Sequence, residues 1–317
     1  MKILVTGGAG YIGTTLVPLL LEHGHRVTVL DSLRFGIGPL LPMFRHPHFA
    51  FARADIRDRQ SLAEHARAAD AFVHLAAIVG YPACAQDPAE ATAINVEGSA
   101  NLAAVVGRGR PVVLASSGSC YGAVSGAVCT EDTPLRPLSL YGQTKAQAET
   151  LLLDQCETIV YRLATAFGLS PRLRIDLLDN DFVYRALHEH RLTVYEGQHR
   201  RSFLHVYDVA RAILLALDHS AEMAGRVLNV GDERQNCTKL ELCRIIQQVV
   251  PGLAVEAAAM GQDADRRDYA VSYARITALG FHGTISLAEG VCELARVLPW
   301  IDRREPFDNV SQRIAGS

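Results

Sequence analysis

The chain of 317 residues has no long hydrophobic run. No uninterrupted apolar stretch reaches about 18 residues, the length that a membrane-spanning helix requires. The sequence opens with Met1-Lys-Ile-Leu-Val, which starts a strand at once and leaves no room for the charged and hydrophobic segments of a signal peptide. We therefore expect a soluble, cytoplasmic protein with no membrane partner.

Long runs of basic residues are also missing. The chain has 31 lysines and arginines against 34 aspartates and glutamates, a net charge of −3, and no block of about six basic residues. Proteins that bind nucleic acid need such positive charge to meet the phosphate backbone. Nucleic acid is therefore excluded as an expected partner, and no internal repeat or low-complexity tract suggests an array.

Paired cysteines and metal-ligand clusters are lacking as well. The seven cysteines are scattered and form no C-x-x-C, so an odd count without an export signal indicates reduced thiols. On a helix an i, i+2 spacing points histidine rings apart, and no cysteine or carboxylate completes a ligand set. We expect no metal at the three histidine pairs, which are His23/His25, His46/His48 and His188/His190.

What the sequence does have is a glycine turn between a strand and a helix at its start. An apolar run at residues 3–5 suits a strand that is buried on both faces, and leucines then recur at helical spacing after Gly13. Gly8, Gly10 and Gly13 form G-x-G-x-x-G, and Gly7 extends the spacing to G-x-x-G-x-x-G. Such glycines let the backbone approach a pyrophosphate at the helix N-terminus. The stretch predicts a bound dinucleotide.

An acidic residue closes the second expected strand, at residues 26–30. Asp31 can accept hydrogen bonds from both hydroxyls of the adenosine ribose, and its charge repels a 2′-phosphate. We therefore expect NAD as the cofactor. Two alternatives stay open: Asp31 can instead cap a helix or turn, and Arg34 can pair with the 2′-phosphate of NADP.

Two further strands bring candidate cofactor contacts to the same edge of the sheet. Asp55 follows the third strand, at residues 49–53, where its carboxylate can accept a hydrogen bond from the adenine amino group. The fourth strand, at 71–75, runs into Ala76 and Ala77, whose small side chains permit backbone contact with a cofactor. Its His74 is interpreted as a hydrogen-bonded core residue and not as a catalyst.

The next segment supplies a candidate substrate loop and a helix. Residues 78–88 connect the sheet edge to an expected helix over 89–106. Within that helix, Asn95 is either part of the scaffold of the active site or an exposed or capping residue. A fifth strand, at 111–115, then ends in a serine-rich turn that carries Ser117.

A tyrosine and a lysine four residues apart follow this turn. Tyr141 and Lys145 lie on one face of an expected helix. An ammonium group and a positively charged nicotinamide both favour phenolate, so the tyrosine can exchange a proton with a substrate hydroxyl as hydride moves. Ser117 would hydrogen-bond the same substrate oxygen. The alternative is an ordinary surface pair, which is disfavoured because a nucleotide fingerprint and a strand-end serine precede the two residues.

Together these motifs resemble the extended short-chain dehydrogenases/reductases of the nucleotide-sugar epimerase/dehydratase type. The matching pieces are Thr6–Gly13, Asp31, Asp55–Arg57, His74–Ala77, Asn95–Gly98, Ser116–Ser119 with Tyr121-Gly122, and Tyr141-x-x-x-Lys145. The resemblance implies catalysis by Ser117, Tyr141 and Lys145. The NAD contacts that it implies are Gly7, Gly10, Tyr11, Ile12, Gly13, Asp31, Asp55, Ile56, Leu75, Ala76, Ala77, Asn95, Tyr141 and Lys145.

The second half resembles the family more loosely. Residues 162–169 match a family Arg-x-x-Asn-x-Tyr-Gly-Pro segment, with Thr165 for the asparagine and Leu169 for the proline. Asn180 is expected to cap a helix over 182–189 or to present its N-terminus to a diphosphate. The substrate contacts that the resemblance implies, two arginines of a diphosphate clamp included, are Ser117, Ser119, Tyr141, Asn180, Arg201 and Arg267.

The resemblance also implies an α/β fold with a doubly wound parallel Rossmann sheet over residues 1–165. Residues 166–317 would mainly form a smaller mixed α/β domain for the substrate, with some segments returning to the first. A homodimer through the helices of Asn95 and Tyr141 and a role in carbohydrate biosynthesis are implied as well.

The reaction depends on the turn after Ser117. In the dehydratases that this segment resembles, two acidic residues follow the serine or threonine and eliminate water, whereas Gly118 and Ser119 stand here. We therefore expect an NAD-dependent nucleotide-sugar epimerase, with a dehydratase or ketosugar reductase as the alternative. A non-catalytic NAD-sensing protein is a third possibility, disfavoured by the intact Ser117, Tyr141 and Lys145.

Overall fold

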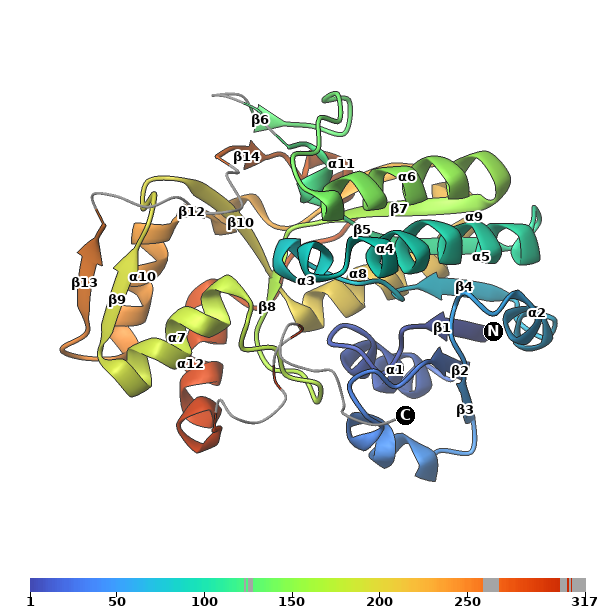
Figure 1. The fold of residues 1–317 in the computed structure, drawn as a ribbon, viewed down its shortest axis with the longest axis horizontal. Coiled ribbons are helices and arrows are strands. Elements are labelled where there is room, and N and C mark those ends of the chain that lie inside the picture. Colours follow the sequence, from blue (N-terminus) through green and yellow to red (C-terminus); the bar gives the residue numbers. More distant parts are fainter. Residues whose placement is uncertain (123, 125–127, 259–267, 303–306, 308, 310–317) are drawn as a thin grey trace.

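A seven-stranded parallel sheet forms the centre of the molecule, with helices on both of its faces (Figure 1). The structure is a computed structural model that describes residues 1–122, 124, 128–258, 268–302, 307 and 309. The strand order is β11-β7-β5-β4-β1-β2-β3, and every neighbouring pair is parallel. The strands are β1 (Lys2–Thr6), β2 (Arg26–Asp31), β3 (Phe49–Arg53), β4 (Ala71–His74), β5 (Pro111–Ser117), β7 (Glu157–Leu163) and β11 (Val227–Val230).

Alternating side chains of the strands build two cores, one on each face of the sheet. Ile3 and Val5 pack with residues of α1 (Gly13–Glu22) and α8 (Val206–Asp218). Leu4 points to the opposite face, where the cover comes from α2 (Arg59–Ala66), α5 (Gly98–Val106) and α6 (Leu140–Gln155). Both faces of the sheet are buried beneath helices, which explains the continuous apolar runs of these strands. The predicted doubly wound α/β fold is confirmed.

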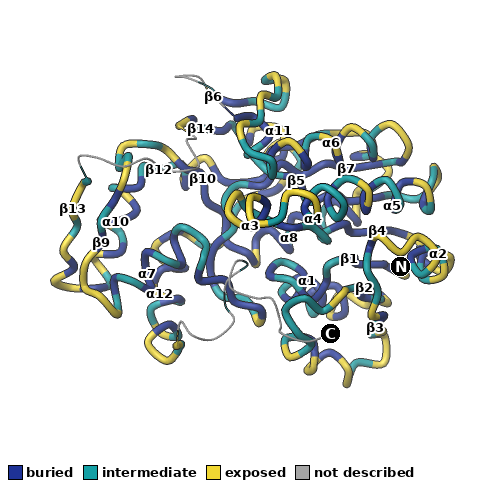
Figure 2. Tube along the Cα trace, viewed as in Figure 1, coloured by how far each residue is buried: buried dark blue, intermediate teal, exposed yellow. Residues whose placement is uncertain are grey.

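A smaller group of helices and strands lies beside the large sheet and has a core of its own. Phe167, Phe203 and Leu242 are fully buried there, and Figure 2 shows the contrast with the more exposed outer pair of strands of this group, β9 and β13. Its strands are β8 (Thr165–Phe167), β10 (Arg200–His205) and β12 (Asn236–Thr238) in one sheet, and β9 (Arg191–Val194) with β13 (Ala254–Ala257) in another. Its main helices are α7 (Leu178–Glu189), α10 (Lys239–Val249) and α12 (Leu287–Val297).

The second half of the sequence also contributes to the large sheet. β11 pairs with β7, so that Leu228 stands beside Tyr161 at the sheet's edge. The remaining short elements are β6 (Val128–Cys129) paired with β14 (Ala270–Val271), α9 (Ser220–Met223), α11 (Ala274–Ala278), and the 3₁₀ turns Gly38–Arg45, Gly118–Cys120, Glu233–Gln235 and Leu298–Trp300. Within the described residues, no helix is long and apolar enough to span a membrane.

Two helix predictions and one loop prediction need correction. The helix expected over 89–106 consists of α4 (Pro88–Thr92), a π-helical turn (Ala93–Glu97) and α5, and the preceding loop contains α3 (Tyr81–Gln86). The helix expected to start at Phe182 starts four residues earlier. Asn180 therefore lies inside its first turn and does not cap it, because the N-cap position belongs to Leu177.

Candidate active site

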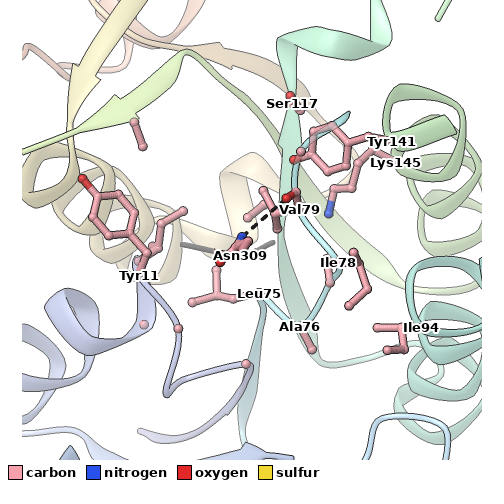
Figure 3. Close-up of a pocket in the computed structure, with 18 of the residues that line it drawn as sticks. Tyr11, Leu75, Ala76, Ile78, Val79, Ile94, Ser117, Tyr141, Lys145 and Asn309 are labelled. Carbon is pink, nitrogen blue, oxygen red and sulfur yellow. Dashed lines mark hydrogen bonds between the residues drawn. The ribbon is translucent and has the colours of Figure 1, made fainter. Parts of the chain in front are cut away.

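A pocket with a volume of about 460 Å³ opens at the carboxyl ends of the parallel strands. Gly7, Asp31, Leu75 and Ser117 line it from the ends of four strands. The opposite wall comes from the smaller group, including Arg174. Ligands of open α/β sheets bind at this edge, and Figure 3 shows Tyr11 and Leu75 across the pocket from Tyr141 and Lys145.

The glycines of the first turn make room that no other residue would leave. Gly7 has φ +73°, and a Cβ atom built on it would stand 2.5 Å from the backbone nitrogen of Ala76. A Cβ atom on Gly13 would stand 2.5 Å from the Cα of Gly8. α1 begins at Gly13, so the positive end of its helix dipole lies at this turn. This cradle fits the pyrophosphate of a dinucleotide.

Asp31 is fixed in place by two backbone N–H groups. Ala9 N donates to its Oδ2 at 3.0 Å, and Leu33 N donates to its Oδ1 at 2.8 Å. Burial raises the pKa of Asp31, and these two hydrogen bonds oppose that rise. The carboxylate is therefore held in position before any ribose hydroxyl reaches it.

The same end of the pocket carries two arginine–carboxylate pairs. Arg57 donates from Nε and Nη2 to the two oxygens of Asp55, at 2.9 and 2.7 Å, and these bonds hold the pKa of Asp55 below its usual value. Arg34 donates from Nη1 to Glu90 Oε2 at 2.9 Å. We call Asp31, Arg34, Asp55, Arg57 and Glu90 the charged end of the pocket.

At the other end, Tyr141 and Lys145 project from the first two turns of α6. The helix begins at Leu140, because Gly142 N donates to the capping oxygen of Ser139 at 3.2 Å. Ser117, the last residue of β5, lies beside the phenol, as Figure 3 shows. Ser117, Tyr141 and Lys145 form what we call the tyrosine end.

Burial sets the proton affinities at the tyrosine end. It raises the pKa of Tyr141 to about 12, against a weaker lowering by the hydrogen bond with Ser117. It also lowers the pKa of Lys145 to about 8. The expected lowering of the tyrosine's pKa by the lysine does not appear in the protein alone, because desolvation disfavours both charged forms.

A buried ion pair lies behind the tyrosine end. Glu149, one turn after Lys145 on α6, accepts from Arg162 Nη2 at 2.8 Å and from Nε at 3.2 Å. The Ser116 hydroxyl also donates to Glu149. The two charged side chains are only 4% and 7% exposed. The pair ties α6 to β7 and β5 at the place where the catalytic candidates lie.

Most of the predicted cofactor and substrate residues meet in this one pocket. They are Gly7, Gly10, Tyr11, Ile12, Gly13, Asp31, Asp55, Ile56, Leu75, Ala76, Ala77, Ser117, Ser119, Tyr141 and Lys145.

Asn95 lies behind the pocket wall and supports it. Its side chain accepts from Ile78 N at 2.7 Å, and its Nδ2 donates to Ile78 O and to the Thr144 hydroxyl, each at 3.0 Å. These bonds fit the scaffold role that the sequence allowed for Asn95, and the residue is not part of the lining of the pocket, where the resemblance implied a cofactor contact. His74 lies in the same interior, hydrogen-bonded to the hydroxyls of Thr6 and Ser99 at 2.7 and 3.0 Å, as expected of a core histidine, and burial lowers its pKa to about 3.

Two of the residues predicted in the second half, Asn180 and Arg201, do not line the large pocket. Asn180 is buried and accepts from Gly168 N at 3.1 Å. Arg201 is 4% exposed and lines a small separate cavity, which shares Leu163, Ala164 and Thr165 with the large one. Arg267 lies outside the described residues.

Three polar residues that the sequence did not single out do line the large pocket. Arg174 makes a bidentate pair with Asp176, at 3.0 and 2.6 Å. Arg172 Nη2 donates to Asn309 Oδ1 at 3.0 Å, and Asn309 Nδ2 donates to Val79 O at 3.4 Å, the dashed line in Figure 3. Only the run Ser-Pro-Arg-Leu-Arg at 170–174 could have drawn attention, as a small basic cluster beside a turn.

The sequence pattern of the NAD dependent epimerase/dehydratase family matches residues 3–231. The chain belongs to this family. It is 32% identical over 325 residues to a dTDP-glucose 4,6-dehydratase of Streptomyces griseus, which covers 96% of this chain and 95% of the relative. The predicted family resemblance is confirmed.

Solved structures of the epimerase/dehydratase family agree with the fold. The dTDP-glucose 4,6-dehydratase DesIV of Streptomyces venezuelae, solved with NAD bound, superposes with a TM-score of 0.81 at 30% identity, covering 95% of this chain and 96% of its own. The UDP-glucuronic acid 4-epimerase of Bacillus cereus has a TM-score of 0.85 at 24% identity, covering 95% and 99%, and supports the fold alone.

NAD is the cofactor of this family, and the pocket fits it. The cradle of Gly7 and Gly13 accommodates a pyrophosphate, and Asp31 is held where a ribose can meet it. Bound NAD supplies a hydride acceptor and donor. The tyrosine end holds side chains that are able to accept and donate a proton beside it.

Proposed function

We propose that this protein is an NAD-dependent nucleotide-sugar epimerase that oxidises one sugar carbon transiently and reduces it from the other face. The observation that carries the proposal is the distribution of carboxylates around the pocket. Among the described lining residues, the carboxylates are Asp31, Asp55 and Glu90, all in the charged end. The tyrosine end offers hydroxyls and a lysine, but no carboxylic acid to eliminate water.

The proposed roles follow from position and proton affinity. Tyr141 accepts the proton of the substrate hydroxyl when the sugar is oxidised and returns it when the sugar is reduced. Ser117 hydrogen-bonds the same oxygen and orients it. The ammonium of Lys145 lies one helical turn from the phenol, where its charge favours the phenolate during proton transfer. Proton and hydride both return to the sugar, so no net redox change results.

The pocket also suits an anionic substrate. Arg172 and Arg174 line its wall, and the charge of Arg174 acts on the tyrosine end, where it contributes to lowering the pKa of Tyr141. Guanidinium groups bind diphosphates and carboxylates in the same forked geometry. We propose Arg172, in place of the predicted Arg201, as the cation that meets the nucleotide sugar, while Arg174, which Asp176 holds by two hydrogen bonds, adds positive charge to this wall. The diphosphate or a sugar carboxylate would be the ligand of Arg172.

A panel of nucleotide sugars tests this function. Purified protein with NAD is offered UDP-, GDP-, CDP- and dTDP-hexoses and UDP-glucuronic acid, and products are identified by proton NMR while absorbance reports NADH. We expect one pair of epimers to interconvert without net NADH accumulation, and no conversion by Tyr141→Phe. A 4-keto-6-deoxy product would replace the epimerase with a dehydratase.

The dehydratase is the second candidate because of sequence kinship. Three dTDP-glucose 4,6-dehydratases match the chain at 30–32% identity. Gly118 and Ser119 oppose it, since neither side chain can act as the acid that expels water. A ketosugar reductase would instead consume stoichiometric NADH, which the same absorbance measurement detects.

A further inference from the structure

The loop after β2 places an arginine where it can influence the choice between NAD and NADP. Arg34 follows Asp31 by three residues, and both line the charged end of the pocket. Leu33 lies between them with φ +61°, a left-handed conformation, and its N–H is bound by Asp31 Oδ1. This hydrogen bond fixes the turn that presents the guanidinium to the pocket.

Glu90, on the facing wall, captures that guanidinium. It belongs to α4, and its backbone N–H donates to Asp87 Oδ1 at 2.9 Å, which anchors the residue at the start of the helix. Its Oε2 accepts from Arg34 Nη1 at 2.9 Å. The side chains of Arg34 and Glu90 are 31% and 30% exposed, so the pair lies at the rim of the pocket.

The other arginine of the charged end is captured in the same way. Arg57 is bound at both oxygens of Asp55. Within the described lining residues, this end holds three carboxylates and two guanidiniums, each guanidinium bonded to a carboxylate. A 2′-phosphate entering here would have to break an existing pair before it met a positive charge.

We propose that Glu90 is a specificity-determining residue for the cofactor. It withholds Arg34 from the 2′-phosphate of NADP and adds a second negative charge to that of Asp31. NAD lacks the 2′-phosphate and does not compete for Arg34. Specificity for NAD thus arises from repulsion by Asp31 and from the pairing of Arg34, the cation of this described loop that lines the pocket and could bind the 2′-phosphate.

The test is a set of binding titrations that requires no turnover. Calorimetry measures Kd for NAD⁺ and NADP⁺ on the wild type, Asp31→Asn, Asp31→Asn/Glu90→Gln and Asp31→Asn/Glu90→Gln/Arg34→Gln. Because a hydrogen bond to a charged group is worth more than one between neutral groups, we expect Glu90→Gln to tighten NADP⁺ binding about tenfold in the Asp31→Asn background. NAD⁺ binding should change by less than about threefold, and Arg34→Gln should abolish the gain for NADP⁺.

Glu97→Gln in the same Asp31→Asn background is the matched control. Glu97 is exposed on the same run of helix, contributes to the field at Arg57, and does not line the pocket. Its removal takes away one negative charge but releases no arginine, so NADP⁺ affinity should stay within about twofold. The proposal is overturned if Glu90→Gln gives no more than this control, or if the gain survives Arg34→Gln.

Discussion

The two ends of the pocket use charge in opposite ways. At the charged end, every guanidinium of the described lining is paired with a carboxylate, and the pairs Arg34–Glu90 and Arg57–Asp55 are partly exposed to solvent. At the tyrosine end, Tyr141 and Lys145 stand without a carboxylate in the wall, and burial moves the pKa of each toward its neutral form. Under our proposals, the charged end discriminates between cofactors, whereas the tyrosine end holds side chains that become charged only when a ligand changes their surroundings.

The free-energy cost of an exposed ion pair differs from that of a buried ionisable group, and this difference suits the two ends to different tasks. An exposed pair costs little to form and contributes about 0–1 kcal/mol, so it suits discrimination by geometry. The charged form of a buried ionisable group is unfavourable until an opposite charge comes close to it. At the tyrosine end, a positively charged nicotinamide is that charge, since it favours phenolate where burial alone opposes it.

Removing the phenol hydroxyl should have the largest effect. Tyr141→Phe is expected to reduce turnover by about 10²–10⁴-fold, because proton transfer by a positioned side chain contributes that much. NAD binding should change little, since the hydroxyl does chemistry and adds little to cofactor affinity. Initial rates and calorimetric Kd values measure the two effects separately.

An exposed tyrosine outside the pocket provides the control for this change. Tyr207 is 42% exposed and lies on α8, so Tyr207→Phe should leave both rate and affinity unchanged. If Tyr141→Phe keeps more than about a tenth of the wild-type rate, another residue is the base.

The next effect compares a buried pair with an exposed one. Glu149→Gln leaves Arg162 buried beside a neutral amide and is expected to lower the free energy of unfolding by about 3–5 kcal/mol. Glu90→Gln removes the rim partner of Arg34 and should cost less than about 1 kcal/mol. Urea denaturation at pH 7 measures both. Equal losses would mean that burial does not distinguish the two pairs.

The sequence predicted the features that depend on the backbone or on short spacing. The glycines of the first turn were recognisable because backbone must pass close to Ala76, and Tyr141 with Lys145 because four residues make one helical turn. Asp31 was recognisable because a strand end is a fixed place in a parallel sheet. None of these depends on how distant segments pack.

Features that depend on tertiary packing were missed. For Asn95 the sequence left a scaffold role, a cap and a cofactor contact side by side, and only the packing of its amide against the loop at Ile78 favours the scaffold. Long side chains were the hardest to place, since Arg201 lines a separate cavity while Arg172 and Arg174 reach the pocket. The Arg34–Glu90 pair joins residues 56 positions apart, which no local pattern connects.

The last prediction concerns the loss of folding stability that results from burying Lys145. Burial lowers its pKa from 10.5 in the unfolded chain to about 8, so the native state binds fewer protons than the unfolded state between these pH values. Stability therefore rises with pH across that window, and the full cost applies below pH 8. At pH 7 this cost is about 3–4 kcal/mol, because one unit of pKa corresponds to 1.36 kcal/mol.

Replacing the lysine with an uncharged side chain of similar length should remove this cost. Lys145→Met is expected to raise the free energy of unfolding at pH 7 by about 3–4 kcal/mol in the absence of NAD, while turnover is lost. The gain should shrink as pH rises from 8 to 10.5, because the wild-type lysine then folds in its neutral form. Urea denaturation across this range measures the difference, with the exposed Lys2→Met as a control that should show no pH-dependent gain. If the gain is absent at pH 7, or persists unchanged at pH 10.5, burial of Lys145 does not lower the free energy of unfolding. The contrast between the two ends of the pocket would then rest on Tyr141 alone.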